Sequence, residues 1–303
     1  PAALLRRLEQ PLPLLTGGAR DAPERQRTLR ATIAWSHDLL DEPEQQLFAR
    51  LAAFAGGCTL EAAEAVCGAD VDTLGSLLDK NLLRREESRY AMLETIREFA
   101  VERLDEVADG DEIRRRHAEH FLAFALDAQP ELVRREQRRF LDLLEDDHDN
   151  LRAAVSWLLD AEPEDALALA LALALSIFWY TRGHVREGRD WLVAALECAS
   201  PAPSATRAGA LDWAGYLANE LGDDGRPLLE QAAACAREAD ASGALALALC
   251  HLYQDVAELD DLVLEDDVAL VGAVRVHTRE HLHKGGLSRT VLTADRVDLA
   301  TGD

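Results

Sequence analysis

The feature that most constrains the fold is an apolar run of 15 residues, Ala166 to Tyr180, in which Ser176 is the only interruption. A helix that crosses a bilayer needs about 20 apolar residues, so this run is short for a membrane span. Its Ala-Leu alternation has the period of a strand, but Ala and Leu are both strong helix formers. The run therefore predicts a helix that is buried on most of its sides.

The composition extends this helical prediction to the whole chain. Hydrophobic residues make up 48% of the 303 residues and charged residues 29%, so most of the chain is expected to fold. Aromatic residues contribute only 5%, while Ala and Leu dominate, which favours helix over sheet. The length fits two domains or one elongated array.

The charge balance is strongly acidic. The chain carries 32 basic and 56 acidic residues, a formal net charge of −24. Such a charge repels phosphate backbones, so nonspecific nucleic-acid binding by the whole chain is not expected. The cysteines are odd in number and form no C-x-x-C pair, which predicts free, mostly buried thiols in a reducing cytoplasm. They are Cys58, Cys67, Cys198, Cys235 and Cys250. No signal segment opens the chain.

The N-terminal third predicts a run of capped helices. A short amphipathic helix carries Leu4, Leu5 and Leu8, and a second helix runs from about Arg25 to Leu40 with Leu29, Ile33 and Trp35 facing inward. Asp41, Pro43 and Glu44 then have the spacing of a capping box with proline in the first turn. The helix that follows is expected to bury Leu47, Phe48, Leu51 and Phe54 and to end at Gly56-Gly57.

Residues 41–107 have the pattern of a winged helix. Thr59 caps a short helix that reaches Cys67, and Asp70 or Asp72 caps another that reaches Leu82. Residues 83–86 and 89–93 then alternate like strands around Glu87-Ser88, which predicts a small hairpin. A helix from Glu94 to Val107 closes the unit.

Paired helices are predicted from residue 112 to about 253. Gly183 and Gly222 each follow one helix and precede an amphipathic one. The 39 residues between them come near the 34-residue tetratricopeptide period once the linker at 201–204 is allowed for. Four parts are thus expected: a helical segment (1–40), a winged helix (41–107), tetratricopeptide-like repeats (112–253) and an acidic tail (254–303) that we do not assign. The predicted fold class is all-α with one small hairpin and α-α superhelical repeats.

The chain holds only two lysines, Lys80 and Lys284. A P-loop needs a glycine-rich turn that ends in Gly-Lys-Ser/Thr, because the ammonium must reach the β- and γ-phosphates. Neither lysine has that setting, so ATP binding or hydrolysis by this chain alone is not expected. The chain opens on Pro1 rather than Met, which suggests a piece of a longer protein.

Three segments resemble the bacterial STAND ATPases, the NB-ARC-like signalling regulators. The first is residues 25–57. The second is residues 90–100, which stand where NB-ARC proteins carry their Met-His-Asp motif. The third joins residues 114–121 to residues 148–154, at the entry to the helical repeats. Together these segments indicate the part of such a regulator that follows its nucleotide-binding core, over roughly residues 1–250.

The resemblance implies a partner and a cofactor that lie outside this chain. In the family, the winged helix folds back on an ADP-bound core, and the repeats sense an inducer or a protein partner. The upstream nucleotide-binding domain would be the partner, and ATP or ADP the cofactor of the parent protein. Leu93 stands where the motif histidine would be, so a histidine contact to phosphate does not carry over to it, while Glu94 keeps the acid.

DNA binding through the winged helix is not expected. The predicted recognition helix, Asp72 to Leu82, offers Asp72, Thr73, Ser76, Asp79 and Lys80 but no arginine. Base reading and phosphate neutralisation need Arg and Lys there. A packing domain is the better interpretation.

Two other patterns carry weaker hypotheses. Residues 277–281 match the H-x-x-E-H pattern of a zinc peptidase class, which makes His277, His281 and His283 weak metal candidates, but a five-residue pattern arises easily by chance. Arg134, Arg135, Arg138 and Arg139 form a basic stripe that most often is a solvated face.

The sensor surface is predicted on the concave face of the repeats, because arrays present extended grooves. The candidate partner- or inducer-binding residues are Tyr180, Arg182, Trp213 and Tyr216, with packing between repeats as the alternative. The sequence thus predicts the regulatory and sensor part of a cytoplasmic, NTP-dependent signalling or transcription regulator, with no catalytic site and no membrane span. A stand-alone tetratricopeptide adaptor is the second hypothesis, and a zinc hydrolase the third.

Overall fold

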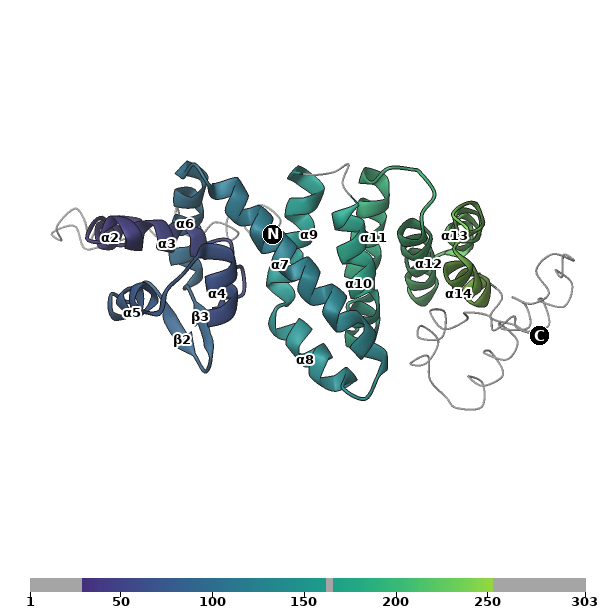
Figure 1. The fold of residues 1–303 in the computed structure, drawn as a ribbon, viewed down its shortest axis with the longest axis horizontal. Coiled ribbons are helices and arrows are strands. Elements are labelled where there is room, and N and C mark those ends of the chain that lie inside the picture. Colours follow the sequence, from purple (N-terminus) through teal and green to yellow (C-terminus); the bar gives the residue numbers. More distant parts are fainter. Residues whose placement is uncertain (1–28, 162–165, 253–303) are drawn as a thin grey trace, which may run out of the picture. The chain divides into compact units, whose positions relative to one another are not determined.

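The computed structural model describes residues 29–161 and 166–252 (Figure 1). They fall into two compact units. The first comprises Pro1–Phe121 and Asp146–Trp157, and the second comprises Leu122–Glu145 and Leu158–Asp303. Each unit is described below by itself, from the residues within the described ranges.

The winged-helix part of the first unit is built around α3 (Glu42–Leu51), which contacts three other helices. These are α4 (Leu60–Cys67), α5 (Val71–Asp79) and α6 (Glu94–Glu106). Helix α2 (Leu29–Asp38) packs on α6. Phe48 lies at the centre with no exposed surface, its ring centroid 5.4 Å from that of His37 and 6.4 Å from that of Phe99. The four apolar residues expected to be buried here are buried: Leu47, Phe48, Leu51 and Phe54.

Local capping sets where these helices begin. The Asp41 side chain accepts from the Glu44 backbone N–H at 3.0 Å, and the Glu44 side chain accepts from the Asp41 N–H at 2.8 Å, so the predicted capping box is confirmed. Thr59 caps α4 and Asp70 caps α5, also as expected. Gly68, in the left-handed region at φ 66°, ends α4.

The wing is a small antiparallel sheet. β2 (Arg84–Glu86) and β3 (Arg89–Ala91) form the predicted hairpin, with Arg85 opposite Tyr90. β1 (Cys58–Thr59) adds a third strand on the other side of β3. The sequence did not predict β1, because two residues are too few to show a strand period.

Several predicted boundaries and orientations were wrong. Trp35 was expected to face inward, but it is 45% exposed, and Leu29 is 38% exposed. Residues two apart on a helix lie about 200° apart, so Trp35 cannot share the buried side with Ile33. Helix α3 ends at Leu51 rather than at Gly56-Gly57. Helix α5 ends at Asp79 rather than Leu82.

Two longer helices contribute residues to the first unit. Residues 110–121 of α7 (Gly110–Ala128) and residues 148–157 of α9 (His148–Ala161) belong to it. The ring of His117 lies 5.1 Å from that of Phe54 and 4.7 Å from that of Phe121, centroid to centroid. These ring contacts join α7 to Phe54, which lies in the loop after α3.

The second unit is a stack of helices that resembles tetratricopeptide repeats, as predicted (Figure 1). Along the chain each of its last five helices contacts the next, and α12 also contacts α10 and α14. The five are α10 (Leu167–Arg182), α11 (Val185–Cys198), α12 (Ala205–Glu220), α13 (Arg226–Glu238) and α14 (Ser242–Leu252). Ahead of them come the 3-10 helix η3 (Gln129–Val133) and α8 (Gln137–Asp146). The apolar run at 166–180 is largely buried in α10, as expected.

Glycines set the spacing of the stack. Gly183 and Gly222 adopt φ of 83° and 81° in the two predicted turns. A Cβ at Gly188 would lie 2.8 Å from Trp179, so α11 approaches α10 over that ring. A Cβ at Gly215 would lie 2.9 Å from the backbone oxygen of Gly225. Helices α12 and α13 therefore meet backbone to backbone at this point.

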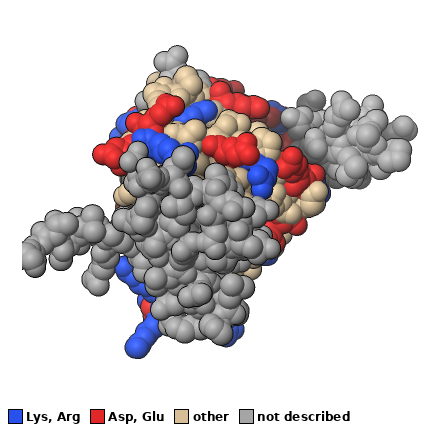
Figure 2. All heavy atoms as spheres, turned by 90° about the vertical axis from the view of Figure 1, so that its right-hand side faces the viewer, with Lys and Arg blue, Asp and Glu red and all other residues tan. Residues whose placement is uncertain are grey.

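The cysteines and the surface complete the description. All five cysteines are free, but only Cys58 and Cys67 are buried, which is fewer than expected. Burial raises the pKa of the Cys58 thiol to about 12, so this thiol stays protonated at neutral pH. Among the described residues visible in Figure 2, acidic and basic side chains are interspersed. No helix within the described ranges combines the length and the apolar character that crossing a bilayer requires.

Candidate functional site

Helix α5 occupies the place of a recognition helix, and the lysine that follows it is paired with a buried carboxylate. Residues 70–80 contain one Lys or Arg, Lys80. Its ammonium donates to both carboxylate oxygens of Glu44, at 2.6 Å for Oε2. Ser76 donates to the same carboxylate. The polar residues of α5 that remain exposed are the acids Asp72 and Asp79, so this helix presents no free cation to a phosphate.

Glu44 is the centre of this arrangement and is only 6% exposed. It caps α3 through the Asp41 N–H while it accepts from Ser76 and Lys80. The hydrogen bond from Lys80, with a second from Ser76, lowers the pKa of Glu44 to about 2. A carboxylate with this set of donors stays ionised and fixes the end of α5 against the start of α3.

Strand β2 of the wing carries two further cations, and both have partners. Arg84 Nη1 lies 3.2 Å from Glu86 Oε1, and Arg85 donates from Nε to the Glu87 carbonyl at 3.2 Å. The Arg85 guanidinium also sits 5.8 Å from the centroid of the Tyr90 ring. These contacts leave a mixed surface on the hairpin rather than a basic one.

Leu93, at the position where the resemblance predicted a motif residue, is the N-cap of α6 without a side-chain hydrogen bond and is 51% exposed. Glu94 starts the helix, and its Oε1 lies 3.6 Å from Arg97 Nη1. The apolar side chain at 93 thus lies on the surface of the first unit.

A buried polar cluster, which we call the loop anchor, joins α9 to the winged helix within the first unit. It comprises the backbone of residues 54–57 and the side chains of Asn150, Asp147, Arg89, Arg97 and His117. Asn150 Oδ1 accepts from the Ala55 N–H at 2.8 Å, and its Nδ2 donates to the Gly57 carbonyl at 2.8 Å and to Asp147 Oδ1 at 2.9 Å. Asn150 has no exposed surface. One side chain thus satisfies backbone groups more than 90 residues earlier in the chain.

Histidine and arginine complete the loop anchor. Arg89 donates to Asp147 Oδ1 at 2.6 Å and to the Gly57 carbonyl at 3.1 Å. Arg97 donates to the Phe54 carbonyl at 3.0 Å. His117 Nε2 lies 3.5 Å from Asn150 Oδ1, and burial lowers the pKa of His117 to about 4, so the ring is neutral at pH 7.

In the second unit the predicted sensor residues occupy different environments. Trp213 is 8% exposed and Tyr216 is 2% exposed, whereas Tyr180 is half-buried and Arg182 is exposed. The three rings form one cluster, with centroids 5.4 Å apart for Tyr180 and Tyr216 and 5.7 Å apart for Trp213 and Tyr216. Burial raises the pKa of Tyr216 above its usual range, and a hydrogen bond with Tyr180 adds to the effect. All three rings come from α10 and α12.

A buried histidine–aspartate contact borders this ring cluster. His251 Nδ1 lies 2.9 Å from Asp212 Oδ1 and 3.0 Å from Oδ2. Asp212 has no exposed surface, and His251 is 7% exposed. The His251 ring lies 4.5 Å from that of Tyr216, centroid to centroid. The pair thus joins α14 to α12 beneath the rings.

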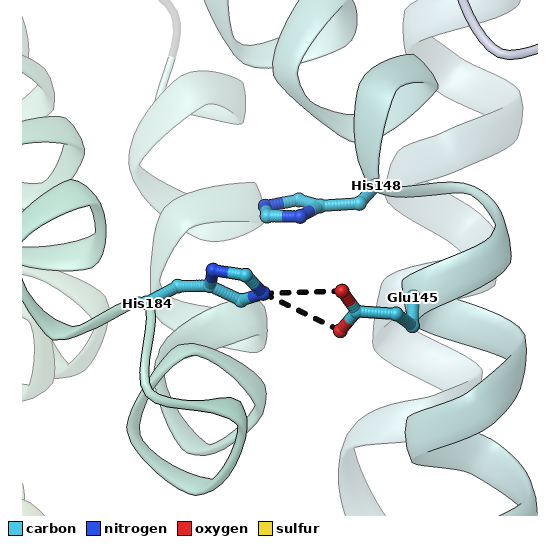
Figure 3. A group of neighbouring side chains, drawn as sticks. All are labelled: Glu145, His148 and His184. Carbon is cyan, nitrogen blue, oxygen red and sulfur yellow. Dashed lines mark hydrogen bonds and ion pairs between the residues drawn. The ribbon is translucent and has the colours of Figure 1, made fainter.

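Arg182 makes ion pairs at the exposed end of α10. It donates to Asp142 of α8, and its Nε lies 3.9 Å from Glu145 Oε2. His184 Nε2 lies 3.3 Å from both Glu145 oxygens, as the dashed lines of Figure 3 show. Helix α8 therefore presents two carboxylates, Asp142 and Glu145, to the turn that follows α10.

The remaining sequence candidates are placed as follows. In the basic stripe, Arg134 pairs with Glu131 at 2.7 Å and Arg139 lies 3.9 Å from Glu136, the local ion pairs of a solvated face. The candidate zinc ligands His277, His281 and His283 lie outside the described residues, as do the tail at 254–303 and the leucines at 4, 5 and 8.

The sequence did not single out Asn150, Asp147 and Arg89 as a cluster, nor Asp212 with His251. Asn150 and Arg89 lie 61 positions apart, and pairing over that distance leaves no trace in local periodicity. The one available signal was Asp212, an acid in the middle of an otherwise apolar helix, which requires a buried partner.

Comparisons with known proteins agree with the fold. Residues 40–105 match the model of the winged helix-turn-helix domain. Proteins of Mycobacterium bovis and Mycobacterium tuberculosis, each named an HTH-type transcriptional regulator, are 38% identical over 195 residues, which cover 61% of this chain. The chain spans only 22% of the length of those regulators. An uncharacterized protein of Mycobacterium tuberculosis is 38% identical over 132 residues, 40% of this chain and 34% of its own length.

Among solved structures, the chain is similar to a signal transduction ATPase with numerous domains (STAND) that has a tetratricopeptide repeat sensor, from Pyrococcus horikoshii. The TM-score is 0.41 and the identity 16%, over 97% of this chain and 49% of that one. The chain thus consists of a winged-helix domain followed by a helical region, and the regulators that it resembles are much longer.

Proposed function

We propose that this chain is the regulatory and sensor part of a cytoplasmic, NTP-dependent transcription or signalling regulator. It acts by binding an inducer or a protein partner through its helical stack and by controlling an ATPase core that lies elsewhere in the parent protein. ATP and ADP are the cofactors of that core. The upstream nucleotide-binding domain is the intramolecular partner of the winged helix.

The observation that carries this proposal is the pairing of Lys80 with Glu44. A winged helix that reads DNA needs free cations on its recognition helix. Here Lys80, which is the only Lys or Arg at positions 70–80, is paired with a buried carboxylate, and the exposed polar residues within α5 are the acids Asp72 and Asp79. The surface of α5 therefore suits a protein partner better than a phosphate backbone. The names of the longer relatives support a regulatory role for the whole protein.

The helical stack supplies the sensor. Stacked helix pairs present an extended binding surface that a single small domain cannot. On this surface we assign partner contacts to Tyr180 and Arg182, which are accessible, while Trp213 and Tyr216 hold the Tyr180 ring in place. Arg182→Ala should leave the melting temperature nearly unchanged and abolish inducer- or partner-dependent activation of the parent protein.

Two measurements test the proposal. The isolated chain should neither hydrolyse ATP nor bind duplex DNA in fluorescence anisotropy at about 100 mM salt, because it has no P-loop lysine and no basic recognition helix. The parent protein should hydrolyse ATP, and deletion of residues 166–252 should change its rate. ATP turnover by the isolated chain, or an unchanged rate after the deletion, would contradict the proposal.

The helical stack also fits a stand-alone tetratricopeptide adaptor. An adaptor would bind its partner with the same affinity whether or not nucleotide is present. A regulator would bind its inducer with an affinity that changes between the ATP and ADP states of the parent protein. Titration of the same partner against both nucleotide states separates the two functions.

A further inference from the structure

The loop anchor holds a segment of backbone that has no secondary structure of its own. Residues 54–57 connect α3 to β1, and four of their backbone groups bond to distant side chains. The Asn150 side chain accepts a hydrogen bond from the Ala55 N–H and donates one to the Gly57 carbonyl. Arg97 donates to the Phe54 carbonyl, and Arg89 also donates to the Gly57 carbonyl. Gly56 N–H is a longer donor to Asn150, at 3.4 Å. Most of the hydrogen bonds that hold this loop thus come from one residue of α9, Asn150.

Asn150 uses its whole hydrogen-bonding capacity in this position. Its oxygen accepts from the loop, and its amide nitrogen donates to the Gly57 carbonyl and to Asp147. An amide side chain offers two donors and one acceptor oxygen, and all are engaged. A displacement of α9 by more than about 1 Å would break these bonds together, because hydrogen bonds weaken steeply beyond about 3.2 Å.

The loop anchor also differs in character from the core beside it. Gly56 is exposed, and Arg89 and Asp147 keep 22% and 17% of their side-chain surface in water. Once the contact opens, water replaces the lost partners, so each bond contributes little net free energy. The neighbouring core is apolar, with no exposed surface at Phe48, Leu74 or Leu77. Separating that core would expose apolar surface with no such compensation.

We propose that the loop anchor is a releasable latch, in which α9 lets go of residues 54–57 in one local opening step while the winged-helix core stays folded. Opening of this latch is the change of state by which α9 acts on the winged helix. The second statement rests on the proposed regulatory function, and the first does not. Helix α9 is suited to this role because residues 148–157 belong to the first unit and residues 158–161 to the second.

Native-state hydrogen exchange on the full chain tests the opening. The amides of Ala55 and Gly56 should exchange at least about 10-fold faster than those of residues 47–51 in α3. Their rates should also be insensitive to low denaturant, because local opening exposes little surface. If both sets of amides exchange at one rate with one denaturant dependence, the anchor opens only by global unfolding and the latch does not exist.

Two variants and a control locate the latch. Asp147→Asn weakens the bond to Arg89, and Asn150→Asp replaces the amide donors of Asn150 with a carboxylate oxygen. Each should raise exchange at Ala55 and Gly56 more than about 10-fold while exchange in α3 stays unchanged. Asp149→Asn removes the same charge as Asp147→Asn from a mostly exposed side chain that pairs with Arg152 at 3.1 Å, and it should change neither. A parallel rise in loop and α3 exchange would show a purely structural role and overturn the proposal.

A final measurement separates the latch from its use. In the parent protein, Asp147→Asn should shift the basal output, whereas Asp149→Asn should not. If loop exchange rises but the output of the parent protein is unchanged, the signalling statement is wrong while the local opening stands. If the loop does not respond at all, both statements fail whatever the function of the chain.

Discussion

Lys80 and Glu44 form a near-buried ion pair that ties the end of helix α5 to the start of helix α3, with Nζ 2.6 Å from Oε2. Glu44 also completes the capping box of α3 by accepting from the Asp41 N–H, and the same carboxylate accepts from Ser76 and Lys80. While the Lys80 ammonium is paired with Glu44, it is less available to neutralise a phosphate.

We expect Lys80→Met to lower the free energy of unfolding by about 1–3 kcal/mol, because Glu44 would remain buried with a donor missing. Urea titration at pH 7 measures the loss. Asp79→Asn changes the neighbouring exposed side chain and should cost less than about 0.5 kcal/mol. The lowered pKa of Glu44 adds a pH dependence. Its stabilisation is complete above pH 4.5 and is lost as pH falls toward about 2. Equal stability of Lys80→Met and the native chain would show that the pair contributes nothing.

Phe48→Ala should cost about 3–5 kcal/mol, because the ring has no exposed surface and its removal leaves a cavity between His37 and Phe99. Trp35→Ala is the matched aromatic truncation on the exposed side of α2 and should cost less than about 1 kcal/mol. Denaturant titration of both variants gives the comparison. A loss below about 1 kcal/mol for Phe48→Ala would mean that α3 does not centre the domain.

The stability of the first unit should fall in weak acid through His117. Burial lowers its folded pKa from 6.5 to about 4, so the unfolded chain binds the proton more readily. Stability should therefore fall as pH drops below about 6.5 and level off near pH 4, by at most about 3 kcal/mol. His117→Phe keeps a ring and should flatten this part of the curve. A slope in His117→Phe equal to that of the native chain would refute the assignment.

His251→Ala should destabilise the helical stack by about 1–3 kcal/mol, because it leaves the buried carboxyl group of Asp212 without this hydrogen-bond partner. The double variant with Asp212→Asn should cost less than the sum of the two single changes, since both changes remove the same contact. Glu238→Gln, an exposed acid on α13, should be nearly neutral. Additive losses in the double variant would show that the two residues do not interact.

Local signals predicted the winged helix well. The Asp41 capping box, the Thr59 and Asp70 caps and the hairpin all depend on residues within four positions of one another, and each is confirmed. Burial of Phe48 followed from helical periodicity in the same way. The prediction that Trp35 faces inward was wrong because it used the size and apolarity of the side chain. The position of Trp35 on the helix, about 200° from Ile33, places it on the opposite side.

The candidate site was less predictable for a physical reason. The partners of Asn150 in the loop lie more than 90 positions away, and the pairing of Lys80 with Glu44 spans 36 positions. Contacts of this range depend on how helices pack, which one sequence does not encode locally. The aromatic residues at 180, 213 and 216 were found because aromatic content is low, yet nothing in the sequence separates a contact residue from a core residue among them.

The close approach of Gly215 and Gly225 gives the helical stack a fixed point that side chains do not control. Where two helices touch through their backbones, one added methyl group at the contact must push the helices apart. A Cβ at Gly215 would lie 2.9 Å from the backbone oxygen of Gly225. Gly215→Ala should therefore increase the spacing between α12 and α13 by a few tenths of an ångström. This shift should also displace α14, which packs on both helices. The same glycine pair offers a single position from which the curvature of the helical stack can be altered.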